Sequence, residues 1–71
     1  MKTVAVEYAY PSSPHSETYG YYHTGCYVVS IDDELGTHYI SAHPSQNEAV
    51  YEAEKTGLPF HKYSLGREEK K

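Results

Sequence analysis

The chain has 71 residues and a formal net charge of −4, with nine tyrosines, one phenylalanine and no tryptophan. This length predicts one small domain with a limited core, and no apolar run is long enough to span a membrane. The N-terminus lacks a basic stretch followed by an apolar one, which argues against a secretory signal. Cys26 is the only cysteine, so no internal disulfide can form, which favours a reducing cytoplasm.

Charge is unevenly distributed along the chain. No lysine or arginine lies between Thr3 and Glu54. That stretch holds eight acids: Glu7, Glu17, Asp32, Asp33, Glu34, Glu48, Glu52 and Glu54. Such a field repels nucleic acid and attracts basic proteins. We therefore expect a basic protein or nucleoprotein complex as partner, with no direct nucleic-acid or membrane contact.

The N-terminal stretch Thr3–Tyr10 alternates valine and tyrosine with smaller or polar residues, which predicts a half-buried strand. Pro11 ends it, because proline cannot donate a hydrogen bond to a sheet. The stretch 11–20 is rich in proline and serine and predicts one long loop.

A β-hairpin is predicted in the middle of the chain. Its strands are Tyr21–Ile31 and Thr37–Ala42, joined by an acidic turn, Asp32–Gly36. Pairing Ile31 with Thr37 gives the hairpin two apolar faces. The face of small residues carries Cys26, Val28, Ser30, His38, Ile40 and Ala42. The larger, more aromatic face carries Tyr27, Val29, Ile31, Tyr39 and Ser41.

A helix is predicted from an N-cap at Ser45 to about Thr56, where Gly57 follows. Glu48, three residues after Ser45, completes a capping box. The apolar stripe of this helix consists of small residues, so we expect it to pack on the hairpin face that carries Cys26 and Val28. The alternative is that the opposite, aromatic face is the core and the helix packs there.

Phe60–Leu65 alternates and predicts a fourth strand, and residues 67–71 form a charged, frayed tail. The predicted fold class is α+β, as a single domain over residues 1–66. Its order is β-β-β-α-β, with a mostly antiparallel sheet and one helix on one face.

The candidates for chemistry are weak. The five histidines have no metal-ligand spacing, and Cys26 lies mid-strand among apolar neighbours, where a thiol is inert. The acids Asp32, Asp33 and Glu34 lie on an exposed turn, where no pocket is implied. We therefore predict no enzyme, no metal and no cofactor, keeping a small metal- or thiol-dependent enzyme as an alternative.

An open tyrosine-rich face remains as the candidate partner surface. The predicted contacts are Tyr27, Tyr39, Val29 and Ile31, with Tyr19, Tyr21 and Tyr22 of the loop end and the acids Asp32, Asp33 and Glu34. The hypothesis is a protein-binding module that inhibits a nucleic-acid-binding complex. Anti-CRISPR and other phage or mobile-element inhibitors are analogous in size and charge alone. The alternative is a homodimer formed through the same tyrosine-rich face.

Overall fold

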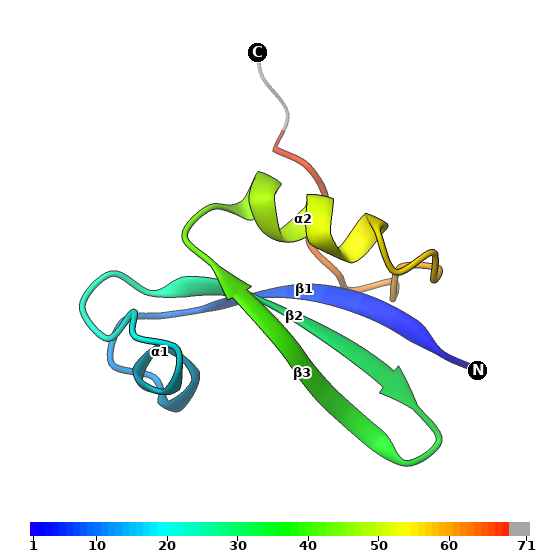
Figure 1. The fold of residues 1–71 in the computed structure, drawn as a ribbon, viewed down its shortest axis with the longest axis horizontal. Coiled ribbons are helices and arrows are strands. Elements are labelled where there is room, and N and C mark those ends of the chain that lie inside the picture. The colour runs from blue at the N-terminus through cyan, green and yellow to red at the C-terminus, as the bar shows by residue number, and fades with distance from the viewer. Residues whose placement is uncertain (69–71) are drawn as a thin grey trace.

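The computed structural model describes residues 1–68 (Figure 1). In chain order the elements are β1 (Thr3–Ala9), α1 (Pro14–Thr18), β2 (Cys26–Asp33), β3 (Gly36–His43) and α2 (Gln46–Glu54). The strands form one antiparallel sheet in the order β1-β2-β3, so β2 is central. The predicted α+β class is confirmed, with three strands rather than four and with a short helix, α1, that was not predicted.

Helix α2 begins as predicted and covers the opposite face of the sheet from the one predicted. Ser45 caps it by accepting from the Glu48 N–H at 3.3 Å. The core between α2 and the sheet consists of Val4, Val6 and Val29 from the strands and Ala49, Val50 and Ala53 from the helix. Pairing of β1 with β2 places Val6 beside Val29. The valines of β1 therefore make this face the more apolar one, which the hairpin considered alone does not reveal.

The second face of the sheet is covered in part by the segment between β1 and β2, which holds α1. Ser13 caps α1, and Pro14 occupies its first turn, where the missing N–H costs nothing. The side chains of Tyr19 and Tyr21 pack against a small cluster of Ala9, Cys26 and Val28. The prediction of an irregular loop over residues 11–20 is therefore wrong for Pro14–Thr18. The pair Ser13–Pro14, a residue type that caps helices followed by one that suits the first helical turn, was the sequence signal for α1.

Ser16 fastens α1 to the end of β1. Its buried hydroxyl lies 3.0 Å from the Ala9 carbonyl oxygen and 2.8 Å from the Tyr10 carbonyl oxygen, which share its proton. We expect Ser16→Ala to lower the free energy of unfolding by about 1–3 kcal/mol, because it removes a buried hydroxyl that donates to these carbonyls and accepts from the Ser13 hydroxyl. Urea denaturation measures the loss. Thr18→Ala removes an exposed bond to the Pro14 carbonyl and is the matched control, expected within about 0.5 kcal/mol of wild type. Equal losses would contradict the anchoring role.

The hairpin is tighter than predicted, and its register differs by one residue beside the turn and by two beyond the bulge. The strands extend to Asp33 and Gly36, which leaves only Glu34 and Leu35 in the turn. The Asp33 carboxylate accepts from the Leu35 N–H at 2.8 Å, and Gly36 adopts a φ of 126°. The first strand also starts later than predicted, at Cys26, because residues 21–25 turn the chain.

The register also shifts within the hairpin. Val29 pairs with Ser41 whereas Ser30 pairs with Tyr39, so Ile40 has no partner on β2. An extra residue of this kind is a β-bulge, which bends the strand and increases its twist. The prediction that Val28 faces Ile40 is therefore wrong.

Residues 59–65 run beside β1 but form only one isolated bridge, Val4 with Phe60, so the predicted fourth strand is wrong. The contacts are Val4 N–H to the Pro59 carbonyl, His61 N–H to the Val4 carbonyl, Leu65 N–H to the Val6 carbonyl and Val6 N–H to the Ser64 hydroxyl. A side chain thus replaces one backbone acceptor, which prevents a regular ladder. This segment nevertheless covers the outer edge of β1.

The predicted tail begins inside the described part of the chain. The Arg67 guanidinium donates to Glu54, and the Glu68 N–H donates to the Asn47 side chain at 2.9 Å. The remainder of the predicted tail, residues 69–71, lies outside the described residues. Within residues 1–68, no helix is long and apolar enough to cross a membrane.

Candidate functional site

The residues predicted to contact a partner do not share one surface. Val29 is fully buried beneath α2, and Tyr27 and Ile31 are half-buried against the same core. Tyr39 lies on the other face of the sheet, since it pairs with Ser30 rather than with Val29. The prediction of an open face that joins Tyr27 to Tyr39 is therefore wrong, because α2 covers most of it.

The tyrosines before β2 divide between core and surface. Tyr19 and Tyr21 are half-buried and pack against the second-face cluster. Tyr22 is exposed, and its ring meets the His23 ring edge-on at 5.2 Å. Two of these three rings therefore stabilise the fold, and only Tyr22 is freely presented.

The acids of the hairpin tip have partners within the chain. Asp32 accepts from the Thr37 hydroxyl, and Glu34 lies 3.4 Å from the N-terminal amine. The Leu35 N–H bond holds the pKa of Asp33 below its ordinary value, aided by His38 at 3.3 Å. Only the N-terminal amine opposes a full charge at the tip, that of Glu34, whereas the bonds to Asp32 and Asp33 orient carboxylates that stay negative.

A pocket of about 190 Å³ opens on the second face of the sheet, and we call it the Tyr39 pocket. It is lined by Glu7, Tyr8, Ala9, Tyr10, Ser13, Pro14, His15, Val28 and Tyr39. Val28 is buried and forms its floor, whereas Glu7, Tyr10 and Tyr39 are exposed. The His15 ring lies 4.3 Å from the Tyr39 ring, so α1 supports one wall.

The chemistry of the Tyr39 pocket suits a cation on an apolar stem. Aromatic faces attract ammonium and guanidinium groups, and the apolar floor accommodates the methylene groups of lysine or arginine. Glu7 supplies the opposite charge, and no lysine or arginine lines the pocket.

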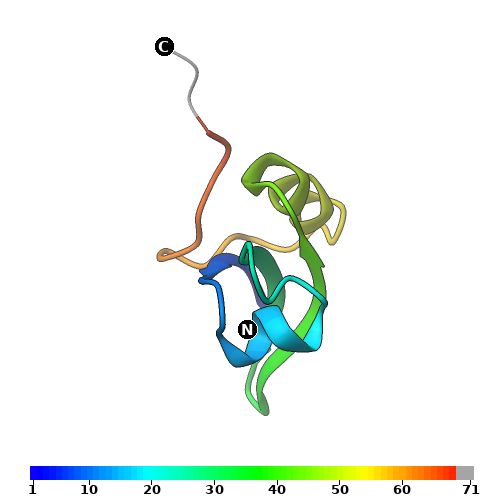
Figure 2. The same ribbon diagram turned by 90° about the vertical axis from the view of Figure 1, so that its left-hand side faces the viewer.

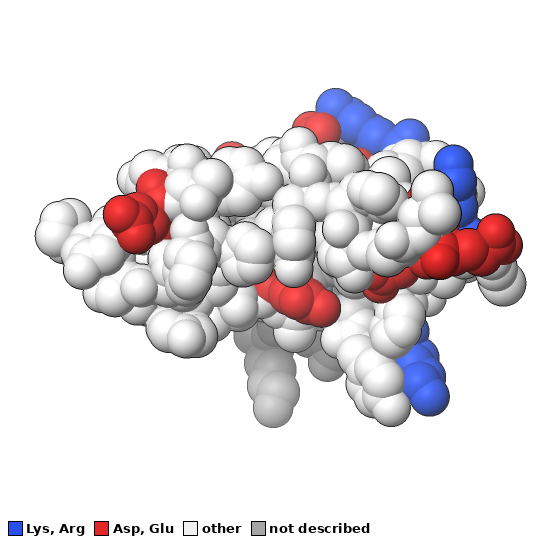
Figure 3. Space-filling model, turned by 90° about the horizontal axis from the view of Figure 1, so that it is seen from below, with Lys and Arg blue, Asp and Glu red and all other residues white. Residues whose placement is uncertain are grey.

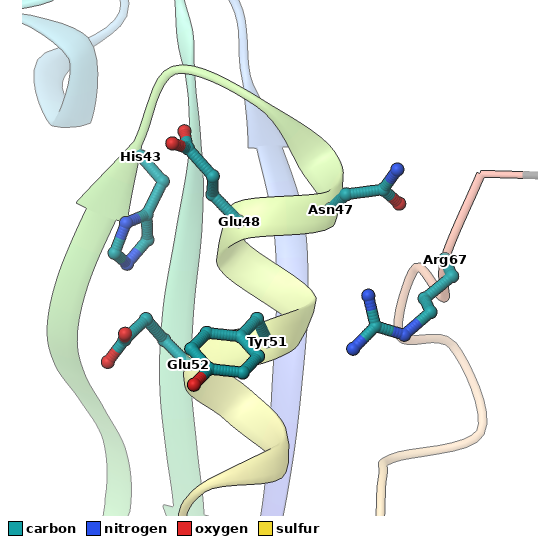
Figure 4. A pocket seen from close by; sticks show the side chains of 6 residues that line it. All are labelled: His43, Asn47, Glu48, Tyr51, Glu52 and Arg67. Atoms are coloured by element: carbon teal, nitrogen blue, oxygen red, sulfur yellow. The ribbon is translucent and has the colours of Figure 1, made fainter.

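A second pocket, of about 380 Å³, lies beside α2, and we call it the α2 pocket (Figure 4). It is lined by His43, Asn47, Glu48, Tyr51, Glu52 and Arg67. Figure 4 shows the carboxylates of Glu48 and Glu52 on the β3 side of the helix, with His43. Arg67 extends on the other side.

The α2 pocket already displays how its groups hold a lysine. The Lys55 ammonium lies 3.1 Å from the Glu52 carboxylate and 4.6 Å from the centre of the Tyr51 ring. The bond to Glu52 raises the pKa of Lys55 above its ordinary value. An acid beside an aromatic ring is therefore a pairing that both pockets share.

The charged side chains are unevenly distributed over the surface of the molecule. Seen from below, Figure 3 shows acidic side chains in separate spots on a mostly uncharged surface. The basic side chains lie toward one end, and the half that holds α1 shows none on this face (Figures 1 and 3). The Tyr39 pocket, which α1 borders, is therefore remote from the basic groups visible in this view.

Sequence reasoning missed most residues of the two pockets. Glu48 and Glu52 are one helical turn apart, which could have indicated a shared helix side. Glu7 alternates with Ala5 and Ala9 and so belongs to the second face. No sequence signal, however, joins Glu7 to His15 and Tyr39, because three separate segments meet there.

The structure assembles no metal-ligand cluster among residues 1–68. Cys26 is buried, and the sheet register directs it to the opposite face from His38. No group of three or more histidine, cysteine or acidic side chains in the described chain could hold a metal ion.

Comparison with protein-family models, with curated proteins and with solved structures finds no match for this chain. The fold therefore establishes only the structural class of this protein, a small α+β domain with a three-stranded antiparallel sheet.

Proposed function

We propose that this protein is a non-enzymatic module that binds a basic protein in a reducing cytoplasm. The observation that carries the proposal is the Tyr39 pocket, where exposed rings and a carboxylate surround an apolar floor and no lysine or arginine lines the pocket. Tyrosine is enriched at protein interfaces because its rigid ring combines apolar area with a hydrogen-bonding group. The acidic stretch between Thr3 and Glu54 favours encounter with positive partners.

The partner class that fits this charge is a protein that handles nucleic acid. Such proteins expose lysine and arginine where they contact phosphates. An acidic module seated on that surface excludes the nucleic acid and acts as an inhibitor. Phage and mobile-element inhibitors such as anti-CRISPR proteins are analogous in size and charge.

Affinity capture with paired variants tests the proposal. Wild-type protein is immobilised and exposed to a nuclease-treated lysate of the source organism, and retained proteins are identified by mass spectrometry. We expect a basic protein that wild type retains and that Glu7→Lys and Tyr39→Ala each retain at least about tenfold less, a loss of about 1.4 kcal/mol or more.

Glu17→Lys is the matched control, because Glu17 is an exposed acid of α1 that does not line either pocket. It makes the same change in net charge as Glu7→Lys. If the control weakens capture as much as Glu7→Lys does, the Tyr39 pocket is not the binding site. If wild type retains no protein that Glu7→Lys loses, the proposed function is wrong.

A further inference from the structure

The two edges of the sheet differ. Residues 59–65 bond to the backbone of β1 and cover its outer edge. Within residues 1–68, the backbone of Gly36–His43 makes no hydrogen bond except to β2. Figure 2 shows β3 along one side of the molecule, with residues 59–65 on the other side. One edge of the sheet is therefore open along β3.

The open edge lacks most of the usual features that prevent strand addition and has one of them, the β-bulge at Ile40. Edge strands are commonly protected by lysine, by proline or by a covering segment. Gly36–His43 contains none of these residues and carries no formal charge. Tyr39 and Ile40 remain 45% and 48% exposed. The bulge at Ile40 bends the strand, which favours a short paired segment over extended stacking of many strands.

The two pockets lie on opposite faces of the sheet at this edge. Tyr39 of β3 lines one pocket, on the face that α1 borders. His43 of β3 lines the other pocket together with α2, on the helix-covered face. Side chains of a β-strand point alternately to the two faces. A strand added to β3 would therefore direct side chains an odd number of residues apart toward different pockets.

We propose that the open edge of β3 accepts an extended basic segment of a partner protein as a fourth strand. Its backbone pairs with β3, and basic side chains on alternate faces enter the Tyr39 pocket and the α2 pocket. Main-chain bonds supply affinity in this mode of recognition, and the pockets supply specificity. This inference rests on the proposed function and names the form of the partner.

A second copy of this chain fits the same edge less well. Its β3 has no lysine or arginine to place beside Glu7, Glu48 or Glu52. Two copies would also bring together two domains that are both acidic over residues 3–54. Charge therefore favours a foreign basic segment over self-pairing.

Labelled peptides test the backbone and the pockets separately. The probes are fluorescein-labelled peptides of about ten residues, composed of threonine and valine with two lysines. In one peptide the lysines are an odd number of residues apart and point to opposite faces. In the other they are an even number apart and share a face. We expect the first to bind at least about tenfold tighter by fluorescence anisotropy.

Backbone N-methylation separates strand pairing from charge attraction. Methyl groups on alternate backbone nitrogens of the tighter peptide remove hydrogen-bond donors and keep both lysines. We expect this peptide to lose at least about tenfold in affinity. We also expect the backbone amides of Gly36–His43 to gain protection from hydrogen exchange when the unmethylated peptide binds. On the protein, Glu7→Lys and Glu52→Lys weaken binding, whereas Glu17→Lys does not.

Three outcomes would overturn the inference. The first is equal affinity of all three peptides, which includes the case that none of them binds. The second is unchanged hydrogen exchange of the β3 amides when the peptide is added. The third is a concentration-dependent dimer that protects the β3 amides without peptide. Equal but measurable affinities that Glu7→Lys still lowers would reject strand addition and leave the proposed binding of basic proteins intact. The capture experiment decides the proposed function independently, because it uses whole partner proteins.

Discussion

Val29→Asp is expected to abolish cooperative folding. Val29 has no exposed surface and packs in the core of β1, β2 and α2. An ionised carboxylate placed there has no basic partner in the core, and its desolvation costs several kcal/mol. A small domain of this size has a total stability of only about 5 kcal/mol or a little more. Far-UV circular dichroism during urea titration should show no cooperative transition.

Ile40→Asp is the matched control for that experiment. Ile40 is also a β-branched residue of the hairpin but is about half exposed and has no partner on β2. We expect a change below about 1 kcal/mol. The pair tests which face α2 covers: had the helix packed on the small-residue face, Val29→Asp would be tolerated. A folded Val29→Asp variant would therefore contradict the core described above.

Gly25→Ala is expected to lower the free energy of unfolding by more than about 3 kcal/mol. Gly25 precedes β2 with a φ of 75°, where a Cβ atom is strained. An added Cβ would lie 2.7 Å from the Ala9 carbonyl oxygen and 2.8 Å from the Tyr8 hydroxyl. The first of these atoms is backbone of β1 and cannot move without disturbing the sheet. Urea denaturation measures the loss.

Gly20→Ala separates backbone strain from this close approach. Gly20 has a φ of 86° and nothing within 4 Å of an added Cβ. It should therefore lose only the strain of the left-handed conformation, about 1–2 kcal/mol. Similar losses for both variants would show that the chain before β2 is not held tightly against β1.

Local signals in the sequence predicted the elements that depend on neighbouring residues. The alternation in Thr3–Tyr10 predicted β1, and the capping box at Ser45 predicted the start of α2. The alternation is a local pattern although β1 pairs with the distant β2, and the capping box is a contact three residues apart. The fourth strand failed because alternation in residues 60–65 does not ensure a regular ladder. The chain there bonds to β1 at few positions, one of them through the Ser64 side chain.

The register of the hairpin could not be obtained from pairing preferences. Aromatic and β-branched pairs were available in more than one alignment, and each contributes only about 0.2–1 kcal/mol. The turn at Asp33 and the bulge at Ile40 determine the alignment instead. One residue of difference moved Tyr39 to the face opposite Val29, and the predicted partner surface depended on that placement.

By itself, the sequence determined the α+β class, β1, β3 and the start of α2, and a body with acids but no lysine or arginine between Thr3 and Glu54. These features follow from composition and short-range periodicity. Only the tertiary structure decided which sheet face α2 covers, because the valines of β1 had to join the hairpin first. It also decided where acids meet aromatic rings, since Glu7, His15 and Tyr39 converge from three segments. Such long-range contacts depend on the packing of the whole chain and leave no local pattern.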